Sequence, residues 1–146
     1  MSRRASDGGD KVFRALLRCA RRQGIVVHDS PEMDRWPGLD QVTGCSYYDK
    51  QAEQWVTLLA ARLKKDKQER ALTLAHEIAH YLINHVLQVP FDPERYRHDM
   101  SYRERKEAEA EDGAGWLLRV FGAEVAGELN QPNQPTEPQR PARAAV

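Results

Sequence analysis

Apolar residues recur every three or four positions in three segments of the chain, which is the spacing of a helix that buries one face. The first segment follows Asp10, a residue type that caps helices. It stops before Gly24, which suits the left-handed position just past a helix end. The second segment covers about 69–87 and the third about 102–121. The pattern therefore predicts three long helices.

Between the first two helices the pattern changes to short runs rich in β-branched and aromatic residues, which are typical of strands. Residues 25–28 form the first run. The runs 44–48 and 54–59 flank a polar turn at 49–51 and predict an antiparallel hairpin. We therefore expect an α+β fold, in which a short mixed or antiparallel sheet packs against the helices.

The third helix has its own start and stop signals. Ser101 and Glu104 have the spacing of a capping box, in which each side chain satisfies the other residue's backbone N–H. Gly122 is expected to close this helix, and 123–129 could form a further short one. The connection 89–100 is rich in proline and charge, and we expect it to be irregular.

The two ends of the chain lack helical or strand periodicity. We expect residues 1–9 to be disordered, and also the tail 131–146, which is rich in proline and has almost no large apolar side chain. The part between them, 10–130, is of the usual size for one domain with a single core.

Composition argues against several classes of function. No apolar stretch approaches the roughly 20 residues that a membrane helix needs, and no signal-peptide core follows the charged N-terminus. We therefore expect a cytoplasmic protein with no membrane partner. The 22 basic and 22 acidic residues balance, whereas a nucleic-acid binder usually has a basic excess, so we expect no direct contact with nucleic acid. Cys19 and Cys45 fit no disulfide framework and are expected to be reduced.

The second helix carries the motif His76-Glu77-Ile78-Ala79-His80, which matches H-E-x-x-H. Residues four apart differ by about 40° around a helix, so both imidazoles can bind one metal ion. Zinc accepts imidazole nitrogen and keeps one position open for water in catalytic sites. Glu77 lies about 100° from His76, where it can take a proton from that water and pass it to the leaving amine. The motif therefore predicts a zinc-dependent peptidase.

A third ligand is required, and helical phase narrows the choice. If the helix continues, His85 points about 180° from His76 and faces away from the metal. The acidic run 104–112 in the third helix is the better source. Glu107 belongs to a stripe that becomes apolar further along the helix, and such a stripe faces the core. Glu109, about 200° away, lies on a face that is also partly apolar, so phase favours Glu107 and leaves Glu109 open.

Residues 72–83 and 107–118 resemble two segments of the ImmA/IrrE family of metallopeptidases, which read like TLAHELGHYLL and ExEANxFAxxLL. The resemblance covers about 12–121, and these two segments are its specific part. It implies a zincin-like domain of the gluzincin type, in which a Glu-x-x-x-Asp/Asn pair supplies a third ligand and a supporting group. Carried over, it implies that Glu107 binds zinc and that Glu111 hydrogen-bonds a ligand histidine and fixes its tautomer.

Members of that family are similar in cutting helix-turn-helix repressors, which relieves the immunity of a mobile element or induces a stress regulon. The resemblance therefore implies such a repressor as the protein substrate. Two positions depart from the family pattern: Glu111 replaces a shorter side chain, and Gly113 stands where an aromatic residue is usual. These departures keep open an alternative, a non-proteolytic binding module or antirepressor that sequesters a regulator. The sequence does not indicate an oligomeric state.

Catalysis also needs a hydrogen-bond donor for the developing oxyanion. Tyr96, His98 and Tyr102 lie just before Glu107 and are the candidates. For the substrate, we expect the strand 55–59 to lie at the sheet edge near the active-site helix. There an extended peptide could add as a further strand.

Overall fold

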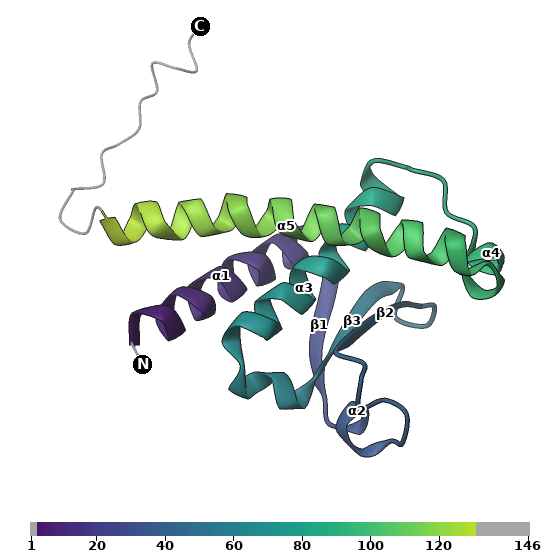
Figure 1. The fold of residues 1–146 in the computed structure, drawn as a ribbon, viewed down its shortest axis with the longest axis horizontal. Coiled ribbons are helices and arrows are strands. Elements are labelled where there is room, and N and C mark those ends of the chain that lie inside the picture. Colours follow the sequence, from purple (N-terminus) through teal and green to yellow (C-terminus); the bar gives the residue numbers. More distant parts are fainter. Residues whose placement is uncertain (1–2, 131–146) are drawn as a thin grey trace, which may run out of the picture.

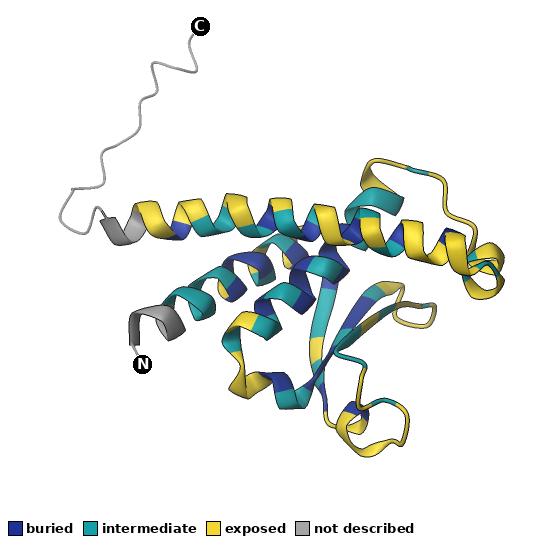
Figure 2. Ribbon diagram, viewed as in Figure 1, coloured by how far each residue is buried: buried dark blue, intermediate teal, exposed yellow. Residues whose placement is uncertain are grey.

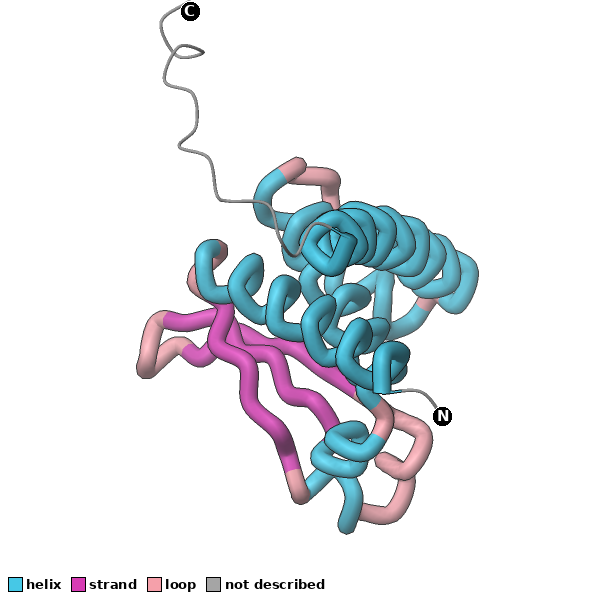
Figure 3. The backbone as a smooth tube through the Cα atoms, turned by 90° about the vertical axis from the view of Figure 1, so that its left-hand side faces the viewer, coloured by secondary structure: helices cyan, strands magenta, loops and turns pink. Residues whose placement is uncertain are grey.

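The predicted α+β fold is confirmed: three strands form a mixed sheet, and the three long helices lie on one side of it (Figure 1; Figure 3). The structure, a computed structural model, describes residues 3–130, and the predicted tail 131–146 lies outside the described residues. The elements in chain order are α1 (Arg3–Arg22), β1 (Ile25–Ser30), α2 (Glu32–Arg35), β2 (Gly44–Asp49), β3 (Gln54–Ala60), the 3₁₀ turn η1 (Ala61–Lys65), α3 (Lys67–Tyr81), the π-helical turn η2 (Leu82–Val86), α4 (Pro93–His98) and α5 (Met100–Asn130).

The sheet has the order β1-β3-β2. The predicted hairpin is confirmed, because β2 pairs with β3 in antiparallel register, whereas β1 pairs with β3 in parallel. The expectation that the strand 55–59 lies at an edge is wrong. This strand carries Val56, Thr57 and Leu59, all buried, and such a strand is best placed between two partners. Of the two edge strands, β2 contacts α3 and β1 contacts α1.

The first helix is longer than its pattern predicts. α1 begins at Arg3, so the expected start at Asp10 is wrong, and the segment before Asp10 contains no proline that would stop a helix. The Asp10 carboxylate instead forms an ion pair with Lys67 at the start of α3, at 3.5 Å. Gly24 has a φ of 80°, the left-handed conformation expected just past the end of this helix.

The helix that carries the H-E-x-x-H motif starts at a side-chain cap. The Asp66 carboxylate accepts a hydrogen bond of 3.1 Å from the backbone N–H of Glu69. The α-helical part ends at Tyr81, and the chain continues as the π turn η2, so the segment predicted as one helix has two geometries. A wider turn of this kind changes the direction in which the later side chains point.

The connection expected to be irregular contains a short helix, α4. Its first turn is capped by the Asp92 carboxylate, which accepts from the backbone N–H of Glu94 and of Arg95. Pro93 lies at the first helical position, where a missing N–H costs nothing. α4 places Tyr96 beside the N-terminal half of α5.

α5 is one continuous helix, so the predicted stop at Gly122 and a separate short helix after it are both wrong. Gly122 lies in the helix interior, where glycine costs about 1 kcal/mol without forcing an end. The predicted capping box at Ser101 is also wrong. Asp99 is the cap, because its carboxylate accepts a hydrogen bond of 3.1 Å from the backbone N–H of Tyr102.

The main core lies between the helices and the sheet, where Figure 2 shows most of the buried positions. The contact between α3 and α5 is made by small residues, with Ala75 and Ala79 on one helix and Ala110 and Ala114 on the other. At Gly113 an added Cβ would lie 3.0 Å from the Cβ of Ala79. The small side chains let the two helix backbones approach closely. This approach brings Glu107 on α5 near His76 and His80 on α3.

Candidate metal centre

Two helices supply the three side chains that converge at one point. His76 and His80 lie one turn apart on α3, and Glu107 reaches them from α5. One ligand atom from each of the three lies within 4.8 Å of the other two. The close packing of α3 on α5 therefore completes a group that the motif on α3 only begins.

The distances among these atoms fit one tetrahedral metal ion. Nε2 of His76 lies 3.1 Å from Nε2 of His80 and 3.1 Å from Oε1 of Glu107, while Nε2 of His80 lies 2.9 Å from Oε2 of Glu107. Ligands about 2.0–2.1 Å from a tetrahedral zinc ion would stand roughly 3.3 Å apart. Two imidazole nitrogens and a carboxylate at nearly this separation are a donor set that suits zinc.

The charges of the three groups are strongly coupled. Hydrogen bonds from His76 and then His80 hold the pKa of Glu107 far below its usual range. The hydrogen bond to Glu107 raises the pKa of His76, and burial of the ring opposes this in part. The carboxylate therefore stays ionised, which is the state in which it can bind a cation.

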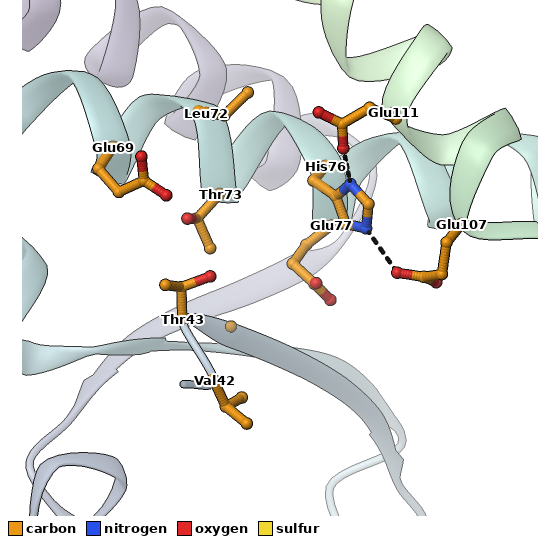
Figure 4. A pocket seen from close by; sticks show the side chains of 10 residues that line it. Val42, Thr43, Glu69, Leu72, Thr73, His76, Glu77, Glu107 and Glu111 are labelled. Atoms are coloured by element: carbon orange, nitrogen blue, oxygen red, sulfur yellow. Dashed lines mark hydrogen bonds and ion pairs between the residues drawn. The ribbon is translucent and has the colours of Figure 1, made fainter. Parts of the chain in front are cut away.

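Glu111 lies on the other side of the His76 ring. Its Oε2 is 3.2 Å from Nδ1 of His76 (Figure 4). A carboxylate at Nδ1 requires the proton on that nitrogen, which leaves the lone pair of Nε2 for a metal. The longer side chain of Glu111 therefore reaches the position that a supporting carboxylate needs.

Glu77 is buried, with 8 % of its surface exposed, and a hydroxyl holds it. Oγ of Ser46 donates a hydrogen bond of 2.6 Å to Oε1 of Glu77 and lies 2.8 Å from Oγ1 of Thr57. Ser46 is on β2 and Thr57 on β3, so the sheet fixes one carboxylate oxygen of a residue on α3. Sequence reasoning missed Ser46, because no spacing rule connects residues 31 positions apart.

The edge strand can come this close to α3 because of one glycine. A Cβ at Gly44 would lie 2.7 Å from Cγ2 of Thr73, closer than packed atoms allow. The glycine lets β2 pack against the first half of α3, next to the carboxylate of Glu77.

An open cleft of about 360 Å³ extends from His76 along α3 (Figure 4). One wall is formed by the chain just before and at the start of β2, and the other by α3 and α5. The lining residues are Val42, Thr43, Gly44, Glu69, Leu72, Thr73, His76, Glu77, Glu107 and Glu111. The cleft continues beyond His76 and Glu107 as far as Glu69. Apart from His76, the ionisable side chains that line it are all carboxylates.

The three oxyanion candidates lie in different surroundings. The hydroxyl of Tyr96 donates a hydrogen bond of 2.8 Å to Oε2 of Glu107, and burial together with this contact raises the pKa of Tyr96. The hydroxyl of Tyr102 is turned away and accepts from the backbone N–H of Asp92. His98 is exposed and pairs with Glu94. Only Tyr96 of the three lies at the group of converging side chains.

The two competing ligand candidates lie elsewhere. Glu109 pairs with Lys106 at 3.2 Å, on a different face of α5 from Glu107. The His85 ring packs edge-on against Trp55 and also against Tyr81, with ring centroids 4.8 and 4.9 Å apart. His85 is therefore absent from the group of converging side chains, as expected, although the π turn at Leu82–Val86 means that the α-helical angle does not describe its direction. Tertiary packing separates Glu107 from Glu109.

Within the described residues, no helix is both long and apolar enough to cross a membrane. Comparisons with protein families, with curated proteins and with solved structures gave no match to this chain. What the structure itself shows is an α+β fold with a candidate metal site of two histidines and a glutamate, the arrangement found in zincins.

Proposed function

We propose that this protein is a zinc-dependent endopeptidase of the ImmA/IrrE type that cuts a helix-turn-helix repressor. One observation carries the proposal: Nε2 of His76, Nε2 of His80 and the Glu107 carboxylate face one point, and the buried Glu77 carboxylate stands beside them. The two sequence segments that resemble this family contain these four residues. The repressor as substrate follows from that resemblance alone.

The chain's own residues divide the work of peptide hydrolysis. A zinc ion held by His76, His80 and Glu107 would polarise the scissile carbonyl and acidify water. Glu77 takes the proton of the attacking water and later gives it to the leaving amine. Ser46 holds one oxygen of Glu77, so the other oxygen is the one that exchanges the proton.

Two further residues support the reaction. Glu111 fixes the tautomer of His76 through Nδ1, as a carboxylate behind a ligand histidine does. The hydroxyl of Tyr96 donates its one proton to Glu107, and it serves as the donor for the developing oxyanion when that proton turns from Glu107 to the substrate. His98 and Tyr102 have no such role, because the first is exposed and the second holds the start of α4.

The substrate lies along β2 rather than along the strand 55–59. β2 is the sheet edge next to α3; its Gly44 borders the cleft and its Ser46 contacts Glu77. An extended peptide that adds to this edge by main-chain hydrogen bonds would bring its backbone past His76 and Glu77.

Metal content and repressor cleavage test the proposal together. Purified protein should carry one zinc ion per chain, and Glu107→Ala should lose it. Glu77→Gln should keep the zinc and lose cleavage of the helix-turn-helix repressor encoded nearest to its gene, because the amide cannot take a proton. Glu109→Gln is the control and should keep both properties.

Three outcomes would count against the endopeptidase. Protein without stoichiometric metal would remove the site, and cleavage by Glu77→Gln would remove the base. A Glu77→Gln variant that still relieves repression would instead identify a non-proteolytic antirepressor. Neither Glu111 nor Gly113 favours that alternative in the structure, since Glu111 contacts His76 and Gly113 permits the close approach of α5 to α3.

A further inference from the structure

From the shape and charge of the cleft we infer that the substrate carries a lysine or arginine about three residues from the bond that is cut, and that Glu69 binds it. The inference rests on the proposed function, because the metal centre defines where that bond lies. It adds a substrate class to the site: a protein segment with a basic side chain at a fixed distance from the scissile bond.

Glu69 lies on the same face of α3 as the metal group. It precedes His76 by seven residues, so at 100° per residue the two differ by about 20° around the helix. Along the axis they differ by roughly 10 Å, since each residue advances the helix by about 1.5 Å. An extended peptide advances about 3.3 Å per residue, so this distance corresponds to about three residues of substrate.

One cleft joins these two positions. Glu69, Leu72 and Thr73 line it from α3, and Val42 and Thr43 line it from the opposite wall (Figure 4). Leu72 and Val42 are half-buried and offer apolar surface within the cleft. The methylene stem of a lysine or arginine can pack on such surface while its charged end reaches a carboxylate.

The negative charge of the cleft favours a cation at the end where Glu69 lies. Four carboxylates line it, and no lysine or arginine does among the residues that the structure describes. With neutral imidazoles, a bound divalent ion would leave two negative charges uncompensated. Three of these carboxylates already have hydrogen-bond partners: Glu107 and Glu111 contact His76, and Glu77 accepts from Ser46.

Glu69 is the carboxylate without such a partner. Among residues 8–127 its carboxylate takes part in no ion pair, and two of the neighbouring basic side chains pair with other carboxylates. Lys67 pairs with Asp10, and Arg70 pairs with Asp29 at 3.0 Å. The Glu69 charge is therefore available to a substrate.

An organic cation fits this position better than a second metal ion. Within the described residues, His76, His80 and Glu107 are the group of three side chains that could hold a metal, and Glu69 belongs to no such group. A divalent ion needs several oxygen ligands, whereas one carboxylate satisfies an ammonium or guanidinium group.

Peptide hydroxamates provide the test, because the hydroxamate chelates zinc and fixes the peptide at the metal centre without any cleavage. One series carries the hydroxamate at the C-terminal end of a short peptide and a second series carries it at the N-terminal end. The third residue from it is lysine, arginine or uncharged norleucine. On zinc-loaded Glu77→Gln protein at low salt, lysine and arginine should bind about fivefold more tightly than norleucine in one series. The difference should shrink in 0.5 M NaCl, because salt screens an exposed charge pair.

Variants of Glu69 complete the test. Glu69→Gln should bind all three peptides equally. Glu69→Gln combined with Gln68→Glu keeps the net charge but moves the carboxylate by about 100° to an exposed position, and should also show no preference. Equal binding of lysine and norleucine to Glu69-containing protein, or a preference that survives Glu69→Gln, overturns the inference. If no hydroxamate binds the zinc-loaded protein, the proposed function itself fails, so the two failures are distinguishable.

Discussion

The Glu77 carboxylate is both buried and held in place, as its proposed role as general base requires. A hydroxyl chain from Thr57 through Ser46 ends on its Oε1 with a hydrogen bond of 2.6 Å. The donor sits on a strand and the acceptor on a helix, so the rigid packing of two elements sets the orientation of the carboxylate. Chemistry that depends on one proton transfer is sensitive to such orientation.

Removing the hydroxyl of Ser46 should therefore slow catalysis without removing the metal. We expect Ser46→Ala to keep its zinc and its KM but to lose about tenfold in kcat, the effect of one hydrogen bond to a charged group. Ser46→Thr restores the hydroxyl and should restore most of the rate. Steady-state kinetics on a cleaved repressor measure this, and an unchanged kcat in Ser46→Ala would show that Ser46 does not position the base.

A second single-residue effect concerns the start of α5. The backbone N–H of Tyr102 and the side chain of Arg95 donate to Asp99 and hold its pKa below its ordinary value of 3.8. A carboxyl whose pKa is lowered by folding stabilises the folded state above its ordinary pKa, and this stabilisation disappears as the pH falls through the lowered value.

We therefore expect Asp99→Ala to lower the melting temperature at pH 7 and to lower it less at pH 3, which lies below the ordinary pKa of the carboxyl. Thermal unfolding followed by circular dichroism at the two pH values measures the difference. Asp99→Asn separates cap from charge, since it keeps an acceptor for Tyr102 and should be milder at pH 7. An equal loss for Asp99→Ala at both pH values would contradict the assignment of Asp99 as an ionised cap.

Among the elements, α3 and α5 together supply the three side chains of the candidate metal site. Their contact is built from alanines and from Gly113, whose missing Cβ leaves room for Ala79 and Ile83. The resemblance implied an aromatic residue at position 113, and the structure gives the reason for glycine here: the helices are too close for a large side chain. The same closeness puts Glu107 within about 3 Å of both imidazoles.

Gly113 and Gly122 offer a matched comparison within α5. Gly113→Leu should destabilise the fold by about 1–3 kcal/mol through overpacking and should weaken zinc binding, because α5 must move away from α3. Gly122→Leu meets no atom within 4 Å at its Cβ and should stabilise the helix by up to about 1 kcal/mol. Urea unfolding and zinc titration measure both effects. Equal behaviour of the two variants would mean that the α3–α5 contact does not control the site.

At the scale of the whole molecule, four elements meet at the candidate metal site. α3 and α5 supply the converging side chains, and β2 and β3 hold Glu77 through Ser46 and Thr57. A metal ion bound by His76, His80 and Glu107 would link α3 directly to α5 and would bind the folded state alone. Ligand binding of this kind stabilises a protein by an amount that grows with the ratio of free ligand to Kd.

Removal of zinc should therefore lower the stability of the whole domain. At free zinc about 1,000 times Kd, we expect a stabilisation of about 4 kcal/mol that chelation abolishes. Calorimetry with zinc and with chelator measures it. Glu107→Ala should melt at the same temperature under both conditions. A wild-type melting temperature that is unchanged by chelation would contradict a metal link between the two helices.

The sequence alone determined the features that arise from local spacing. Apolar periodicity predicted the long helices, the polar turn predicted the hairpin, and the pair His76 and His80 followed from residues four apart on one helix. Such features depend on 3.6 residues per turn or on strand alternation, which act over a few neighbours. The ends of the helices were predicted less well: Asp99 rather than Ser101 caps α5, and α5 continues beyond Gly122.

Only the tertiary structure decided what distant segments do together. The place of β3 at the centre of the sheet, the location of Glu107 rather than Glu109 at the imidazoles, and the contact of Ser46 with Glu77 all depend on how whole elements pack. Both glutamates lie on partly apolar faces of one helix, so their own neighbours cannot separate them. The separation comes from the small residues that bring α3 and α5 together, since side chains in a close-packed interior can adopt few other arrangements.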